Sequence, residues 1–152
     1  MRFFQYFFLI LISVCISGCA SGPKFTGLSK PTHTNSIIYL YRPAAFAGGA
    51  SSPTFQIDGK GSYTLQNGGY LKVITKPGVH TIKAITSWSY VFPLELTITT
   101  KPGSVNFVRH INSRTYKPGF FHGSQMGDGW TGIETVSYEQ GLREIKETSL
   151  SE

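Results

Sequence analysis

Residues 54–86 read TFQIDGKGSYTLQNGGYLKVITKPGVHTIKAIT, and this stretch decides the fold. Short runs of β-branched and aromatic residues alternate with Asp-Gly, Asn-Gly and Pro-Gly pairs. Such pairs favour tight turns, because proline presets the backbone and glycine accepts a positive φ. The pattern therefore predicts strands at 54–57, 62–65, 69–75 and 79–86, with hairpin turns at 58–61 and 77–78.

The same spacing continues on both sides of this stretch. It predicts further strands at 36–42, 90–99, 105–112 and 132–138. Only 14% of the 152 residues are charged, too few for a coiled coil, and 14% are aromatic, too many for a disordered chain. The 17 Gly and 8 Pro among aromatic and β-branched residues favour β structure. We expect an all-β protein, a single β-sandwich of about seven or eight strands over residues 36–148.

The last part of this domain carries a helix signal. Ser137 and Gln140 fit a capping box, and apolar residues follow at helical spacing. We expect a short C-terminal helix at 138–148, packed on the sheet, and a frayed tail at 149–152.

The N-terminus predicts export. Residues 1–18 begin with Arg2, and their apolar stretch would form a helix of only about 21 Å, too short for a hydrocarbon core of ~30 Å. A cleaved signal peptide fits this pattern better than a transmembrane helix.

The residues at the end of the signal, Ile16-Ser17-Gly18-Cys19, resemble a bacterial lipobox. The resemblance implies cleavage before Cys19 and lipidation of its thiol. Cys15 is a poorer candidate because bulky Val14 precedes it, and an ordinary signal peptide cut elsewhere is the alternative. Ala20 at the second mature position implies the outer membrane. Residues 19–35 are then a lipidated flexible tether.

The composition limits the chemistry. Cys15 leaves with the signal and Cys19 carries lipid, so we expect no thiol catalysis and no disulfide. No catalytic motif is present and the four His are scattered, so we expect no enzyme, no metal site and no cofactor. The formal net charge of +6 either attracts anionic partners at an envelope or simply keeps the protein soluble, and an exported protein is not expected to bind nucleic acid.

Two groups of residues are candidates for binding. In a hairpin centred on Pro77-Gly78, Val73 faces Ile82 and Leu71 faces Ala84 inward, which sets Lys72 opposite Lys83 outward. These two lysines either bridge an anion or point separately into solvent. Aromatic residues in two loops either bind sugars, lipid or protein, or cap the ends of the sandwich: Trp88, Tyr90, Phe120, Phe121 and Trp130.

Several motifs occur in a familiar order: IIYLYRP at 37–43, Phe46, Gly48-Gly49, IDGK at 57–60, NGGY at 67–70 and KPGVHT at 76–81. This order is similar to that of an uncharacterised bacterial lipoprotein family, the one numbered 2846 among the domains of unknown function. The Pro-Gly-x-His-Thr element also resembles PEGA-type and transthyretin-like β-sandwich modules. The resemblance covers roughly residues 36–145 and implies a lipid-anchored β-sandwich without an assigned activity.

Three functions follow as hypotheses. The first is a non-enzymatic envelope lipoprotein that is held in the membrane by its N-terminal lipid and docks on another envelope protein. The second is a binder of anionic lipopolysaccharide or peptidoglycan glycans through Lys72, Lys83 and the loop aromatics. The third, a hydrolase, lacks a recognisable nucleophile and base.

Overall fold

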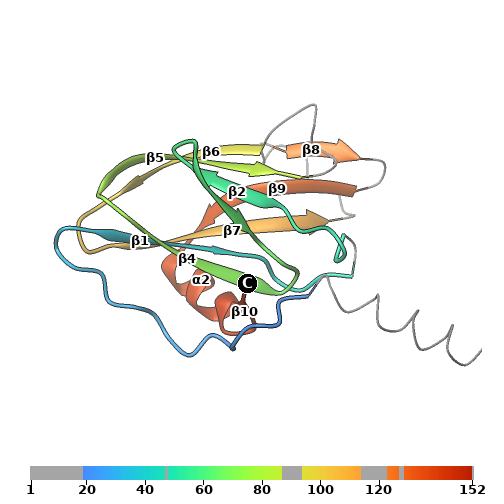
Figure 1. Cartoon of the computed structure of the whole chain (residues 1–152), viewed down its shortest axis with the longest axis horizontal. Coiled ribbons are helices and arrows are strands. Elements are labelled where there is room, and N and C mark those ends of the chain that lie inside the picture. Colours follow the sequence, from blue (N-terminus) through green and yellow to red (C-terminus); the bar gives the residue numbers. More distant parts are fainter. Residues whose placement is uncertain (1–18, 47, 87–93, 114–122, 127–128, 152) are drawn as a thin grey trace, which may run out of the picture.

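The computed structural model describes residues 19–46, 48–86, 94–113, 123–126 and 129–151. Two stacked β-sheets with one short helix beneath them form the domain, which confirms the predicted all-β sandwich (Figure 1). The predicted signal peptide at 1–18 lies outside the described residues. Among the residues that are described, no helix has the length and apolar character needed to cross a membrane.

The two sheets differ in size. The six-stranded sheet has the order β10-β4-β1-β7-β9-β8, and the four-stranded sheet has the order β3-β2-β5-β6. In chain order the elements are β1 (Ser36–Tyr41), β2 (Thr54–Ile57), β3 (Lys60–Thr64), β4 (Gly69–Thr75), β5 (Gly78–Ile85), β6 (Leu94–Thr100), β7 (Val105–Ser113), β8 (Gly123–Met126), β9 (Gly129–Val136), α2 (Tyr138–Ile145) and β10 (Ser149–Leu150).

All eight predicted strands are present in the described residues, with ends shifted by a few positions. The hairpin at Asp58–Gly61 is also confirmed, because β2 and β3 pair as antiparallel neighbours. Two strands were not predicted. β8 lies within the glycine-rich stretch that the sequence suggested was a loop, and β10 lies in the stretch expected to fray.

The predicted hairpin around Pro77-Gly78 is wrong. β4 pairs with β1 and β10, whereas β5 pairs with β2 and β6 in the other sheet. The chain therefore arches from one sheet to the other at this turn. Val73 and Ile82 were correctly predicted to point inward, but they meet across the core between the sheets rather than side by side in one sheet. The alternation of inward apolar and outward polar side chains along the strands fits a hairpin and an arch between the sheets equally well. The sequence pattern therefore could not distinguish the two.

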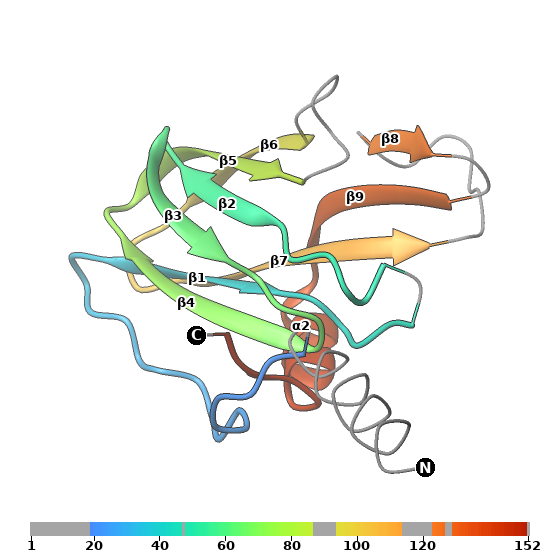
Figure 2. The same ribbon diagram turned by 45° about the vertical axis from the view of Figure 1, so that its right-hand side comes forward.

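The strand β1 lies in the centre of the larger sheet and all six of its residues are buried. Its inward side chains, Ile38 and Leu40, join the core between the two sheets. Its outward side chains, Ile37, Tyr39 and Tyr41, form a second apolar cluster with Phe107 and Ile145. The helix α2 and the N-terminal segment cover this second cluster (Figure 2).

Residues 19–35 are therefore not a flexible tether. The ring of Phe25 packs edge-on against Tyr39 and Tyr70, with centroids 5.9 and 5.3 Å away. The backbone N–H of Ser29 donates to the hydroxyl of Tyr39 at 2.8 Å. The prediction failed because the outer face of the larger sheet is apolar and has to be covered, which the composition of the segment alone does not reveal.

The C-terminal tail is also held rather than frayed. β10 runs parallel to β4, and the N-terminal segment lies on its other side. The N–H of Gly22 donates to the carbonyl of Leu150 at 3.2 Å, and the N–H of Phe25 donates to that of Thr148 at 3.1 Å. Both ends of the described chain thus complete the same edge of the larger sheet.

The helix α2 begins as the capping box predicted, since the hydroxyl of Ser137 accepts from the N–H of Gln140 at 3.2 Å. The Gln140 side chain instead donates to Glu144 at 2.9 Å.

Arg109 on β7 donates to Glu144 at 2.9 Å and also pairs with Glu134. Although burial opposes ionisation, hydrogen bonds from Gln140, Tyr41 and Arg109 hold the pKa of Glu144 below its ordinary value. This network fixes the helix on the sheet.

The helix lies so close to the sheet that position 141 has to be glycine. A Cβ on Gly141 would lie 2.6 Å from the Cβ of Phe107. Alanine normally stabilises an exposed helix relative to glycine, but we expect Gly141→Ala to destabilise this domain by roughly 1–3 kcal/mol through overpacking. Urea unfolding measures the difference. Arg143→Ala, on the exposed side of the same helix, should stay close to wild type, and a stabilised Gly141→Ala variant would contradict this packing.

Candidate functional site

Arg42 organises the loop that leaves β1. Its side chain is buried, and its guanidinium donates to the carbonyl of Gly48 at 2.6 Å and to that of Ser51 at 2.5 Å. Burial lowers the pKa of Arg42 from its ordinary value, but an arginine keeps its charge in proteins. Because a buried charge is costly without partners, these bonds tie the conformation of the 42–51 loop to Arg42.

Asn67 joins this loop to the N-terminus. Its side-chain oxygen accepts from the N–H of Ala45, and its side-chain nitrogen donates to the carbonyl of Ala45, both at 3.0 Å. Its own backbone carbonyl accepts from the N–H of Ala20 at 2.9 Å. Through its side chain and its backbone, this one residue therefore brings the loop after β1 and the start of the described chain to the same end of the sandwich, where Cys19 is exposed.

Close backbone contacts keep this loop tight. A Cβ on Gly49 would lie 2.8 Å from the carbonyl oxygen of Ala45 and 3.0 Å from the amide nitrogen of Asn67. Gly48 and Gly68 adopt positive φ values of 72° and 67°, which suit glycine. Phe46 is the largest exposed side chain of this loop, at 100% exposure. We call Cys19, Arg42, Ala45, Phe46 and Asn67 the anchor end.

Asp58 and His80 form a second polar contact. Nδ1 of His80 lies 2.8 Å from Oδ2 of Asp58, and Nε2 lies 2.7 Å from the backbone carbonyl of Lys76. A carbonyl can only accept, so Nε2 carries a proton, and the carboxylate favours a proton on Nδ1 as well. Burial opposes this charged form, but the bonds to Asp58 and Lys76 raise the pKa of His80 overall. The bond from His80 in turn lowers the pKa of Asp58.

His110 differs from His80. It is buried on β7 beside Phe55, with ring centroids 5.9 Å apart, and neither ring nitrogen has a hydrogen-bond partner among the described residues. Burial, together with the nearby charge of Arg42, lowers the pKa of His110 to about 3. The ring is therefore neutral at physiological pH. In the described part of the chain, no three His, Cys, Asp or Glu side chains come together as metal ligands.

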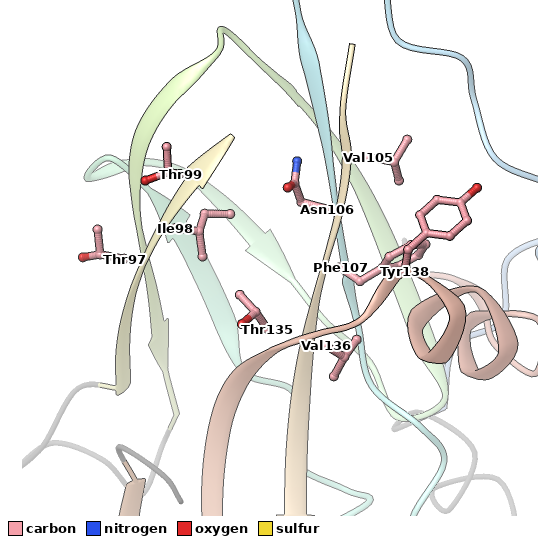
Figure 3. A pocket seen from close by; sticks show the side chains of 9 residues that line it. All are labelled: Thr97, Ile98, Thr99, Val105, Asn106, Phe107, Thr135, Val136 and Tyr138. Atoms are coloured by element: carbon pink, nitrogen blue, oxygen red, sulfur yellow. The ribbon is translucent and has the colours of Figure 1, made fainter. Parts of the chain in front are cut away.

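A groove of about 430 Å³ opens between β6, at the edge of the smaller sheet, and strands β7 and β9 of the larger sheet (Figure 3). Strands β6, β7 and β9 and the first residue of α2 contribute its lining: Thr97, Ile98, Thr99, Val105, Asn106, Phe107, Thr135, Val136 and Tyr138. Hydroxyl groups, one amide and two aromatic rings make this a mixed polar and apolar surface. Among the described residues, β6 pairs only with β5, so its other edge is available beside the groove.

The structure does not bring Lys72 and Lys83 together. Lys72 lies opposite Tyr39 in the larger sheet and donates to the hydroxyl of Ser29 at 3.0 Å. Lys83 lies between Gln56 and Glu95 in the smaller sheet. Because their neighbours in each strand point into the shared core, the two lysines lie on opposite outer faces of the sandwich. The predicted pairing of Lys72 with Lys83 is wrong, so they cannot bridge one anion as cross-strand neighbours.

The predicted loop aromatics cannot be placed as a site. Trp88, Tyr90, Phe120 and Phe121 lie outside the described residues. Trp130 belongs to β9, where its backbone pairs with Ser113 and Gln125. These residues remain candidates on the sequence argument alone.

Sequence reasoning missed the anchor end. Arg42, Phe46 and Asn67 are separated in the chain, and only the strand pairing brings their segments together. The glycines at 48–49 and 68–69 indicated tight turns, and an arginine directly after a fully apolar strand could have suggested a buried charge. No local pattern indicated that the asparagine would hold a loop more than twenty positions earlier.

The contact between Asp58 and His80 predicts a pH-dependent stability. The pKa of His80 in the folded protein is raised above 6.5. Its contribution to the free energy of unfolding is therefore complete below pH 6.5 and is lost as the pH rises through the folded pKa. The lowered pKa of Asp58 gives the opposite change in acid, where stability is lost as the carboxylate is protonated below about 3.8.

We therefore expect the free energy of unfolding to decline as the pH rises above 6.5 and through the raised folded pKa of His80, and His80→Gln to remove much of that decline. Urea titrations at several pH values measure it. His33→Gln, at an exposed position, should keep the wild-type profile. Equal pH slopes for wild type and His80→Gln would show that the contact does not contribute.

Comparison with known proteins identifies the family but no activity. No curated protein and no solved structure matches the chain significantly. The family described as "Protein of unknown function (DUF2846)" matches residues 32–124, from just before β1 to β8. That match covers more than half of the chain and includes Arg42, Phe46 and Asn67 of the anchor end. The chain belongs to this family.

Proposed function

We propose that this chain is an envelope lipoprotein, cleaved before Cys19 and lipidated there, which serves as a non-enzymatic accessory module for another envelope protein. The observation that supports it is the position of Cys19. Its side chain is exposed, while the next residue, Ala20, is already hydrogen-bonded to Asn67 in the body of the domain. A lipid on Cys19 would emerge directly from one end of the sandwich. The second mature residue, Ala20, favours the outer membrane, with the domain facing the periplasm.

This arrangement separates the anchor from the groove. The pairing of β1 sets Ile37 beside Val105 of the groove, whereas Tyr41, at the other end of β1, pairs with Tyr70 near Asn67. Cys19, which bridges to Asn67, therefore lies toward one end of the sheet and the groove toward the other. A module anchored through Cys19 would hold the groove away from the membrane, where a partner could reach it.

The groove suits an extended segment of a protein. The available edge of β6 offers backbone N–H and C=O groups, which a partner strand could satisfy. Val105, Val136 and Tyr138, which are partly exposed, supply apolar contacts beside that edge, and Thr99 and Asn106 supply polar ones. Backbone pairing with side-chain pockets alongside is a known way in which domains bind extended peptides.

The polar contacts favour binding over catalysis. His80 forms the only His–carboxylate ion pair among the described residues, and both of its ring nitrogens are already bonded, to Asp58 and to Lys76. A general base needs a ring nitrogen that faces its substrate. His110 is enclosed and has no carboxylate beside it in the described structure.

Crosslinking in intact cells tests the proposal. A photo-crosslinking side chain at Thr99 should capture one specific envelope protein, and the same probe at Lys83, on the outer face of the smaller sheet, should not. The capture should decrease strongly in Cys19→Ser, because loss of the lipid releases the module from the membrane and lowers its effective concentration. Fractionation should find that variant in the soluble fraction, and the mass of the wild-type N-terminal peptide should include the lipid.

Two results would contradict the proposal. A wild-type protein without lipid on Cys19 would refute the anchor. Recovery of only lipopolysaccharide or peptidoglycan fragments, lost as salt is raised, would refute the protein partner and favour an anionic glycan as the ligand.

A further inference from the structure

Phe46 has an unusual environment for a large apolar side chain. It is 100% exposed, more than any other large hydrophobic residue in the described structure. Exposing a phenylalanine to water has a free-energy cost unless another surface covers it. The residues around it in the sequence, Pro-Ala-Ala-Phe-Ala-Gly-Gly at 43–49, are apolar and small, so the loop offers neither charge nor bulk beside the ring.

The backbone that presents Phe46 is held in place. Directly before it, Ala45 makes two hydrogen bonds with the side chain of Asn67. On the other side of Phe46, the N–H of Gly49 donates to the carbonyl of Phe46 at 3.2 Å. The buried guanidinium of Arg42 donates to the carbonyl of Gly48. A buried arginine and a buried asparagine thus hold in place a loop whose largest side chain is exposed to solvent.

The same asparagine determines what lies beside the loop. Its backbone carbonyl binds Ala20, and Cys19 is only one residue away from that bond, a distance of about 3.8 Å between Cα atoms. A flexible tether over residues 19–35 could instead have extended up to roughly 55 Å. With the segment packed on the sheet, a bilayer that receives the lipid of Cys19 has to come close to the anchor end.

From these contacts we propose that Phe46 inserts into the phospholipid bilayer beside the lipid of Cys19 and that the anchor end is a membrane-contact surface with a fixed orientation. This inference rests on the lipidation of Cys19 proposed above. A lipid chain alone leaves a domain free to rotate about its attachment point. A second apolar contact on a loop that Asn67 ties to the same point would restrict that rotation and keep the groove directed away from the bilayer.

A fluorophore at position 46 tests this directly. The lipidated protein, which has no free thiol once Cys19 is modified, is prepared as Phe46→Cys, labelled with an environment-sensitive dye and placed in vesicles of phosphatidylethanolamine and phosphatidylglycerol. We expect emission at shorter wavelength than in detergent-free buffer, and quenching by nitroxide-labelled lipids. Val79→Cys is the matched control, since Val79 is 67% exposed but follows the turn at the far end of β4. Its dye should remain in water and escape the quencher.

Transfer between vesicles gives a second measurement. Phe46→Ser should leave donor vesicles roughly tenfold faster than wild type, the order of effect expected for losing one buried phenylalanine. Val79→Ser should transfer at the wild-type rate. Because Phe46 is fully exposed, neither result should reflect unfolding, and urea midpoints equal to wild type would verify this.

The outcomes distinguish the inference from the proposed function. If the protein carries lipid and remains on vesicles but the dye at 46 stays in water, the bilayer contact is refuted and the anchor stands. A shift to shorter wavelength without quenching by lipid would also refute it, because position 46 would then be covered by protein. If the protein carries no lipid and does not remain on vesicles, both the anchor and the contact are refuted.

Discussion

The burial of β1 on both faces is the constraint on which the rest of the structure depends. Its outward side chains, Ile37, Tyr39 and Tyr41, are as inaccessible as its inward ones. The smaller sheet covers only the inner face of the larger sheet, so the outer face of the larger sheet needs a second covering layer. The helix α2 and residues 19–35 supply that layer, and β10 extends the sheet beside them. The N- and C-terminal segments are therefore parts of the fold rather than appendages to it.

That second layer determines the position of Cys19. Because Phe25 packs on Tyr39 and Tyr70, and Ala20 is bonded to Asn67, the start of the described chain is held against one end of the sandwich. The packing that hides the outer face of the sheet thus places Cys19, the proposed site of the lipid, at the same end as the loop that carries Phe46. In this account, stability and membrane orientation arise from the same contacts, and the groove beside β6 is available at the other end of the sheet.

Local patterns in the sequence predicted local structure well. The strands, the turn at Asp58–Gly61 and the N-cap at Ser137 each follow from residues near one another in the chain. The arch between β4 and β5 could not be distinguished from a hairpin, since both leave Val73 and Ile82 facing inward. The binding of Ala45 by Asn67 and the covering of Tyr39 by Phe25 depend on the sheet order, which no local pattern encodes. For the same reason the predicted site at Lys72 and Lys83 was wrong, and the anchor end was missed.

The amide hydrogen exchange of Ala20, Gly22 and Phe25 tests the central claim most directly. Each of these N–H groups donates to a carbonyl of the domain, so exchange should be slowed to an extent comparable with the amides of β4. The protection should be the same in the lipidated protein and in Cys19→Ser, because the packing does not require the lipid. Exchange at the rate of an unstructured peptide would show that residues 19–35 are a free tether, and would contradict an anchor held against the sandwich.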